Sequence, residues 1–229
     1  MVSAVHAEDS SSASANLPAI RRIEWASAGI LKVYPADGPF FCVRDSYLSE
    51  GCKAYLDDAG AGGDLPLSAG VAEDLLHAAR ALLAERTAMG YLARSEYCRR
   101  QLDERLARKG FSPAERDEAL SFLASAHRLD DYRYATAWLR SRLIHQSEGR
   151  RKLLAGLFSR GISSDDAERA LNDFFQDTDE RVLCERATEK MVRLGKNGEK
   201  LYAALLRKGF SGKIIAETVK KLANDQNNC

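Results

Sequence analysis

The sequence lacks the features that mark membrane, secreted and fibrous proteins. Nowhere in its 229 residues do apolar side chains run for the ~18 consecutive positions that a membrane span requires. Its 16 glycines and 5 prolines are too few for a collagen or a low-complexity chain. With 45% hydrophobic residues the composition is that of a folded globular protein, and a chain of this length buries about 70% of its unfolded surface without disulfide or metal staples.

Cysteine is scarce and unpatterned. The five cysteines, an odd number, form no C-x-x-C pair, which favours a reduced, cytoplasmic protein over a secreted disulfide scaffold. Cys98 and Cys184 fall in helix-like stretches, where a free cysteine usually serves as a small buried hydrophobe. The first 16 residues contain no basic region followed by an apolar one, so we interpret residues 1–18 as a disordered tail and not as a signal peptide.

Charge of either sign is nearly balanced over the whole chain, at a formal net charge of +1, but it is unevenly distributed. Residues 1–70 hold 5 Lys/Arg and 9 Asp/Glu, a net charge of −4, and residues 71–229 hold 29 Lys/Arg and 24 Asp/Glu, a net charge of +5. The basic part of the chain permits an anionic partner but does not require one.

The N-terminal part has the pattern of a small β element. Short runs rich in β-branched and aromatic residues, Ile20–Ala26, Ile30–Tyr34 and Phe40–Arg44, are separated by Gly and Pro and predict two or three strands. Two or three strands are marginal alone, so they must pack on another element. The Gly-rich stretch Asp57–Gly70 predicts a loop or linker.

From Val71 to Leu222 the pattern is helical and contains an internal repeat with spacings of 51 and 48 residues. When Gly110, Gly161 and Gly209 are aligned, leucines lie eight and four residues before each glycine. Phe or Ile follows each glycine directly, Ser comes next, and apolar residues lie ten and thirteen positions after it. Each repeat is preceded by a further helical stretch. The sequence therefore predicts three tandem three-helix modules.

Each column of the repeat has a physical reason. Two leucines four residues apart share one face of a helix. The glycine ends that helix in the left-handed conformation that other residues rarely adopt. The serine then caps the next helix, most completely at Ser112, where Pro113 and Glu115 complete a capping box.

Motifs for catalysis or metal binding are incomplete. Gly156–Ser163 resembles a phosphate-binding loop, but Ile162 stands where the loop needs its lysine, and no strand precedes it. The four histidines share no ligand spacing, and no G-x-S-x-G nucleophile motif occurs. Asp130 and Asp131 are explained by a helix start, with Asp130 as its cap and Asp131 favourably near the helix dipole. We expect no catalytic residue, no cofactor and no metal.

One stretch combines basic and aromatic residues. Residues 128–160 carry eight Lys/Arg against three acids, with Tyr132, Tyr134, Trp138 and Phe158 interleaved. Arg133 and Arg140 lie seven residues apart and share a helix face. Two interpretations stay open: a solvated helix face with Tyr134 and Trp138 in the core, or a surface for an anionic partner, either nucleic acid or an acidic protein.

These residues carry a resemblance to a known family. Leu129–Ala135 (L-D-D-Y-R-Y-A) resembles the L-D-D-x-R-[FY]-A signature of the RecX family, bacterial modulators of the RecA recombinase. Tyr91–Tyr97 is similar to that family's Y-L-x-R-R-x-[YR]-S region, with Ser95 in place of the second arginine and Cys98 in place of the serine.

Two further blocks follow in the family's order. Gly149–Leu153 with Gly161-Ile162 is similar to its G-x-x-[RK]-[IL]…G-[IV] block, and Leu205–Ser211 resembles its L-x-R-[RK]-G-F-[SD] block. The β-rich N-terminus resembles the extension of longer members. The resemblance covers nearly all of residues 20–222, and four blocks in order with tandem repeats are specific.

The resemblance implies a regulator without catalytic activity that binds in the groove of the RecA–DNA filament. Family members typically block filament growth, ATP hydrolysis, strand exchange and co-protease activity. The implied partners are the RecA filament and, through it, single- or double-stranded DNA, with no membrane partner and a monomeric chain. A helical repeat protein that binds DNA directly and independently of RecA is the alternative.

The expected fold is mainly α, an elongated array of three three-helix repeats with a small N-terminal β element. Its expected parts are the tail (1–18), the β element and linker (19–70), and repeats at 71–128, 129–177 and 178–229. The candidate partner- or DNA-binding residues are basic side chains in or beside the repeats: Arg133, Arg140, Arg142, Arg150, Arg151, Lys152, Arg160, Lys109 and Lys208.

Overall fold

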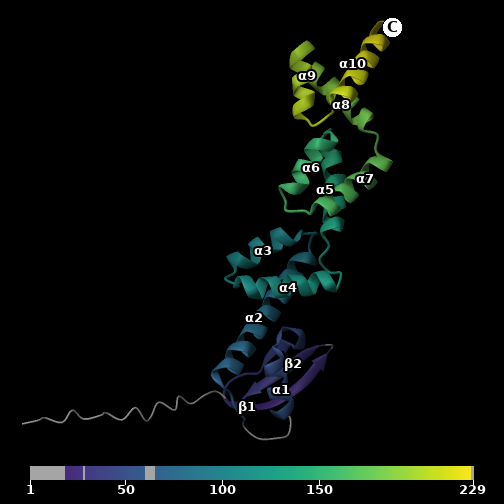
Figure 1. Ribbon diagram of the computed structural model, residues 1–229. Coiled ribbons are helices and arrows are strands. Elements are labelled where there is room, and N and C mark those ends of the chain that lie inside the picture. The colour runs from purple at the N-terminus through teal and green to yellow at the C-terminus, as the bar shows by residue number, and fades with distance from the viewer. Residues whose placement is uncertain (1–18, 28, 60–64, 228–229) are drawn as a thin grey trace, which may run out of the picture. The chain divides into compact units, whose positions relative to one another are not determined.

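The computed structural model describes residues 19–27, 29–59 and 65–227 (Figure 1). The expected tail at 1–18 lies outside these residues. The chain divides into two compact units between Ala84 and Glu85, within one long helix. The expected fold class, mainly helical with a small N-terminal β element, is confirmed, and the domain bounds expected from the sequence stay a prediction.

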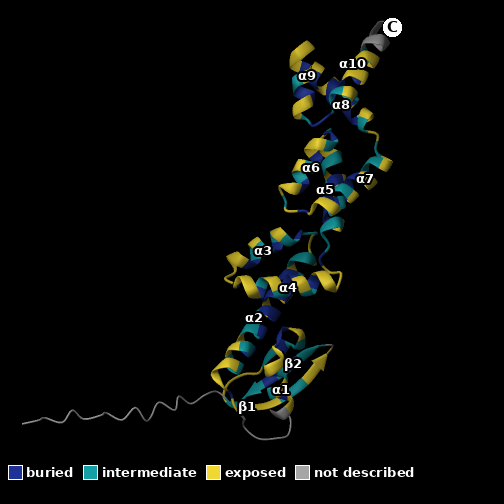
Figure 2. Ribbon diagram, viewed as in Figure 1, coloured by how far each residue is buried: buried dark blue, intermediate teal, exposed yellow. Residues whose placement is uncertain are grey.

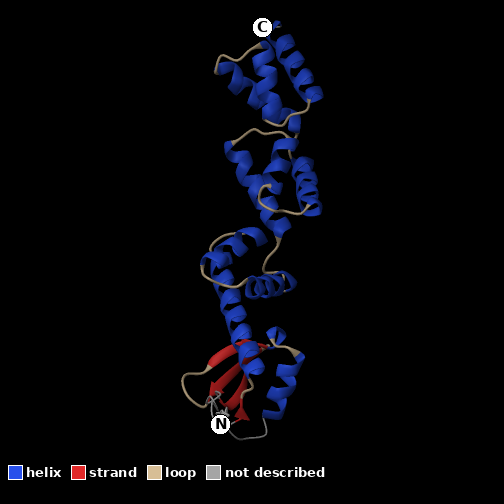
Figure 3. Cartoon of the chain, turned by 60° about the vertical axis from the view of Figure 1, so that its left-hand side comes forward, coloured by secondary structure: helices blue, strands red, loops and turns tan. Residues whose placement is uncertain are grey.

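The N-terminal unit is built on a four-stranded antiparallel sheet (Figure 3). The strands are β1 (Ala19–Ser27), β2 (Ile30–Pro35), β3 (Phe41–Arg44) and β4 (Leu65–Pro66), in the spatial order β3-β2-β1-β4. Alternate side chains of β2, Leu31 and Val33, are buried, as the period of a strand requires.

The sequence interpretation missed one helix in this unit. After a short 3-10 turn (Asp45–Tyr47), α1 (Glu50–Ala59) buries Cys52 and Leu56 one turn apart. It takes up the start of the stretch expected to be a loop, and β4 and the start of α2 take up its end. A ten-residue helix with two buried positions leaves a weak periodic signal, which explains the omission.

The helices of the three predicted modules lie in the second unit, apart from the first part of α2, which belongs to the N-terminal unit. The long helix α2 (Ala69–Leu92) enters the second unit, and the further helices of the first module are α3 (Arg99–Arg108) and α4 (Pro113–Ser125). The second module comprises α5 (Asp131–His145), α6 (Arg150–Phe158) and α7 (Ser164–Asp177). The third comprises α8 (Glu180–Arg193), α9 (Gly198–Arg207) and α10 (Gly212–Asn227).

The glycine turns have the predicted geometry. Gly110, Gly161 and Gly209 have φ angles of +84°, +79° and +89°. After each, the amide of the next residue donates back to a leucine carbonyl five residues earlier, as in Phe111 to Leu106 at 3.3 Å. This is the hydrogen bond that defines a Schellman cap. The capping box at Ser112 is also present, because the Ser112 hydroxyl accepts from the Glu115 amide and the Glu115 carboxylate accepts from the Ser112 amide.

The second and third modules each have an apolar core, and the buried parts of their helices are dark blue in Figure 2. In the second module, Leu139, Leu157 and Leu171 are fully buried, and in the third Leu183, Leu205 and Phe210 take this role. Cys98 belongs to the core of the second module although it precedes α3 of the first. Neighbouring modules therefore share apolar contacts, as stacked repeats do.

Candidate partner-binding surface

Successive modules meet at joints, and the first joint involves backbone groups. The amide of Arg99, the first residue of α3, donates to Oδ1 of Asp131 at 2.8 Å. The thiol of Cys98 lies 3.3 Å from the carbonyl oxygen of Arg160, at the glycine turn of the second module. Asp131 therefore satisfies a free amide at the start of α3, which a helix cannot satisfy internally.

The second joint repeats the first at the same positions of the next modules. The amide of Arg150, the first residue of α6, donates to Oε1 of Glu180 at 2.9 Å. The amide of Gly149 donates to the carbonyl of Lys208 at 2.9 Å, beside the glycine turn of the third module. Each joint thus pairs the start of a module's second helix with a carboxylate at the start of the following module.

The arginine at each joint is held by its own module. Both guanidinium groups cross to the third helix of their module and meet a carboxylate and a second oxygen there: Arg99 meets Asp117 and Ser121, and Arg150 meets Glu168 and Asn172. The three positions of the second set lie 51 residues after those of the first. Arg150, a candidate contact residue, therefore has its charge engaged inside the protein.

A buried carboxylate gathers three more of the candidate cations. The side chain of Glu148 is only 4% exposed, and it accepts from Nε of Arg142 at 2.8 Å and from the other end of the same guanidinium at 3.1 Å. Nζ of Lys152 lies 3.6 Å from Oε1 of Glu148. Lys208 donates to the carbonyl of Ser147 at 3.3 Å, next to this group.

The pKa values in this group follow from burial and charge. Burial by itself would raise the pKa of Glu148, but the hydrogen bonds from Arg142 and the nearby positive charges outweigh it, and the pKa lies below its usual value. The pKa of Lys208 is lowered, first by burial and then by repulsion from neighbouring cations, although Glu148 opposes this. We conclude that Arg142, Lys152 and Lys208 compensate an internal charge.

Two other candidates have partners within the protein, although Arg133 is exposed. Arg133 pairs with Oε1 of Glu96 at 2.7 Å and donates to the carbonyl of Arg128. Arg160 donates to the carbonyl of Gly156 at 2.8 Å, and its guanidinium lies 4.5 Å from the ring centroid of Trp138. These contacts fix the ends of helices and the turn between them.

The remaining three candidates are open to solvent. Lys109, Arg140 and Arg151 are exposed, and across the described ranges no side-chain partner is present for any of them. Arg140 borders a hollow of about 150 Å³ between α5 and α7, with Asp173 and Asp177 on the far side. Six of the nine candidates therefore have partners within the protein, and the role of all nine in binding stays a prediction.

The sequence reasoning missed the residues that make the joints. Asp131 was assigned to the helix dipole, yet it also accepts from the amide of α3, and burial raises its pKa. The roles of Glu148 and Glu180 were not foreseen. The sequence does contain one signal for the joints: Arg99 and Arg150 are 51 residues apart, which is also the spacing of the first two glycine turns.

The described residues form neither a metal cluster nor a membrane span. Within the described part of the chain, no three His, Cys, Asp or Glu side chains are grouped so that they could hold a metal ion. No helix of that part combines the length and apolar character needed to cross a membrane.

Comparison with known proteins gives a consistent result. Residues 84–123 match the family model "RecX, first three-helix domain", and residues 130–171 match "RecX, second three-helix domain". The chain is 40% identical over 138 residues to regulatory protein RecX of Treponema pallidum (strain Nichols), a span that covers 60% of this chain and 84% of that protein. It is 31% identical over 140 residues to the protein of the same name from Prosthecochloris aestuarii, covering 59% of this chain and 90% of the relative.

Solved structures support the same fold. A crystal structure of regulatory protein RecX superimposes with a TM-score of 0.67 at 20% identity, covering 89% of this chain and 100% of that one. The RecX structure from Lactobacillus salivarius gives a TM-score of 0.56 at 22% identity, over 63% of this chain and 97% of that one.

Proposed function

The chain belongs to the RecX family, and from this premise we propose that it is a regulatory protein that binds the RecA–DNA filament and inhibits it. The inhibited activities are filament growth, DNA-dependent ATP hydrolysis, strand exchange and co-protease activity, as the family implies. The observation that carries the proposal is the match of two successive three-helix modules to the two RecX domain models. The proposed role needs no cofactor and no catalytic group.

The joints support this proposal physically. Each module is tied to the next by hydrogen bonds from backbone amides and by shared apolar contacts, so that neighbours hold a defined orientation. Stacked repeats present an extended surface, and such surfaces suit extended partners better than small molecules. A helical filament is a partner of that kind.

The exposed cations supply the proposed contacts with carboxylates and phosphates of the filament. Lys109, Arg140 and Arg151 can pair with an external anion without losing an internal partner. Arg150 and Lys152 would first have to leave Glu168 and Glu148. Charge complementarity mainly sets the rate and specificity of association, and an exposed pair is worth under about 1 kcal/mol.

We test this with a triple charge reversal, Lys109→Glu, Arg140→Glu and Arg151→Glu. The matched control reverses three exposed cations that also have no side-chain partner in the described residues: Arg186, Lys200 and Lys213. Both variants change the net charge by −6. The measurement is the concentration of protein that halves the ATPase rate of RecA on single-stranded DNA.

We expect the first variant to need at least tenfold more protein and the control to need less than threefold more. Melting temperatures should stay close to wild type, because surface changes usually remain within about 0.5 kcal/mol. Equal inhibition of RecA by both variants would show that Lys109, Arg140 and Arg151 only face solvent and do not contact the filament. If wild type leaves RecA unaffected but binds DNA alone with a steep salt dependence, direct DNA binding replaces the proposed function.

A further inference from the structure

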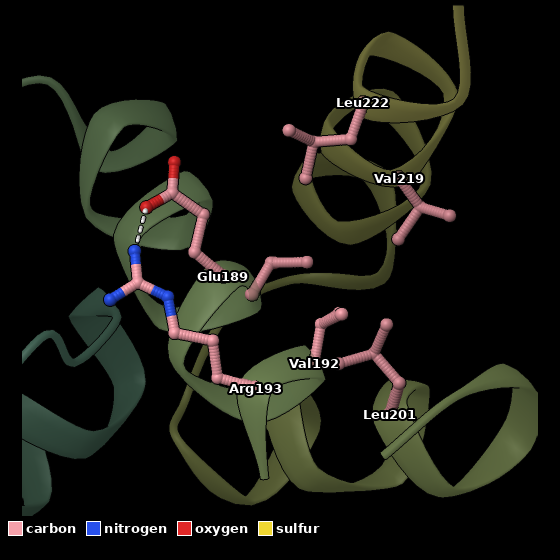
Figure 4. A pocket seen from close by; sticks show the side chains of 7 residues that line it. Glu189, Val192, Arg193, Leu201, Val219 and Leu222 are labelled. Atoms are coloured by element: carbon pink, nitrogen blue, oxygen red, sulfur yellow. Dashed lines mark ion pairs between the residues drawn. The ribbon is translucent and has the colours of Figure 1, made fainter. Parts of the chain in front are cut away.

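The third module carries an apolar groove. Val192 of α8, Leu201 of α9, and Val219 and Leu222 of α10 point into a hollow of about 370 Å³ (Figure 4). The ion pair between Glu189 and Arg193 lies at its rim, at 3.6 Å. A second hollow of about 450 Å³, lined also by Gly198, shares Leu201 and Val219 with the first.

The repeat identifies what this groove is. Leu143 of the second module lies 49 residues before Val192, the offset of the caps Asp130 and Asp179 that begin α5 and α8. Phe174 lies 48 residues before Leu222, the offset of the glycine turns. Both Leu143 and Phe174 pack against the core of the third module. The groove is therefore the third-module copy of the surface that joins the second module to the third.

The difference in exposure agrees with this equivalence. Leu171 is fully buried, whereas Val219 at the corresponding position is 39% exposed. Val192 is 49% exposed, although its counterpart Leu143 is partly covered by the next module. Contiguous exposed apolar surface usually marks an interaction site. No other module covers this face in the part of the chain that the structure describes.

The two joints show what fits such a surface. In each, the covering module begins a helix with a carboxylate, Asp131 or Glu180, which accepts from the amide at the start of the preceding module's second helix. Three residues later that helix carries a buried side chain, Tyr134 or Leu183, in the core of the covering module, and Cys98 or Leu143 of the preceding module packs into or against that same core. The element that covers such a surface is thus the first turn of a helix whose first residue is acidic and whose fourth residue is apolar.

The third module offers the same polar contact beside the groove. Gly198, the first residue of α9, takes the position of Arg150, and Asn197 before it makes no side-chain capping bond. Nowhere in the described ranges does a group accept from the Gly198 amide. The exposed Lys220 lines the second hollow and adds positive charge. A carboxylate is the group that complements these donors.

We propose that this groove docks the first turns of an amphipathic helix of another protein, with an acidic residue at its start and an apolar residue three positions later. The occupant comes from a different protein because both helix starts of this kind in the described chain, at Asp131 and Glu180, are already used in the joints. The inference does not depend on the proposed action on RecA.

The test uses the full chain and a defined probe. The probe is a fluorescent, helix-stapled peptide that copies residues 179–194 with Cys184→Ser, since this segment begins the module that covers the equivalent surface. Its helicity is verified by circular dichroism. Fluorescence anisotropy then measures its dissociation constant on wild type and on variants, in the absence of RecA and DNA.

We expect saturable micromolar binding that Val219→Asp weakens at least tenfold. Val192→Asp, at a second position in the groove, should act in the same way, so that failure of one variant to fold does not decide the test. The control is Val182→Asp, because Val182 is 41% exposed, lines neither hollow, and should change affinity less than twofold. A peptide with Glu180→Gln should bind several-fold more weakly.

Three results would overturn the proposal. One is a lack of saturable binding by a peptide shown to be helical. Another is an equal loss of affinity in Val182→Asp and Val219→Asp. The third is concentration-dependent self-association of the wild-type chain that Val219→Asp abolishes, which would make a second copy of the chain the occupant. None of these results bears on inhibition of RecA, so each proposal can fail alone.

Discussion

A single methyl group at the third glycine turn should open the joint between the second and third modules. Gly209 has a φ of +89°, and a Cβ added there would meet the backbone nitrogen and Cβ of Lys152 closer than real Cβ atoms approach. Gly110 has nearly the same φ of +84° and no atom within 4 Å of an added Cβ. The pair Gly209→Ala and Gly110→Ala therefore separates backbone strain from contact across the joint.

The magnitudes follow from this comparison. Both variants place alanine in the left-handed region, at a cost of about 1–2 kcal/mol. Gly209→Ala adds an overlap with a backbone atom that cannot rotate away, and overpacking of this kind costs about 1–3 kcal/mol. It also weakens the bond from the Gly149 amide to the Lys208 carbonyl, which is worth roughly 1 kcal/mol. We expect an additional loss of about 2 kcal/mol at the joint.

The assay is hydrogen exchange of the full chain. Two kcal/mol corresponds to about a 30-fold change in an opening equilibrium. The Gly149 and Arg150 amides, which bond to the third module, should therefore exchange about 30-fold faster in Gly209→Ala than in Gly110→Ala. If the two variants lose equal stability and leave these amides equally protected, the joint is not held by this close approach.

Two further predictions concern pH and shape. The pKa of Glu148 in the folded protein is lower than its usual value of 4.5, because the contacts with Arg142 outweigh the effect of burial. The ionised carboxylate therefore stabilises the fold above pH 4.5, and this stabilisation is lost as the pH falls through the lowered pKa. Glu148→Gln should lower the free energy of unfolding by about 1–3 kcal/mol at pH 7. Urea denaturation at several pH values should show the difference between variant and wild type shrinking toward pH 3. A difference that does not change with pH would contradict the role given to the Glu148 carboxylate. If the modules stack in a row as the repeat predicts, small-angle scattering should give a radius of gyration well above the compact value of about 17 Å, and a value near it would contradict stacking.

Much of the fold is determined locally, and the sequence predicted that part. A leucine pair four residues apart, a glycine and a capping serine act within about ten residues of one another, so their pattern at Gly110, Gly161 and Gly209 predicted helix, turn and helix three times. The same local character makes the family signature around Asp130 readable. The helix α1 was missed because its signal is short, although the structure shows Cys52 and Leu56 buried on it.

Only the tertiary structure decided which charged side chains pair with one another and which stay exposed to solvent. Counting residues between positions 128 and 160 left open whether the basic stretch is a solvated helix face or a surface for an anionic partner, and it could not show that Glu148 is buried beside three cations or that Arg150 reaches Glu168. A charge interacts over a few ångströms in space, and the partner often lies far away in the chain or in the next module. The sequence therefore determined the modules, whereas the packing of one module on the next determined which cations are left exposed and where the apolar surface remains open.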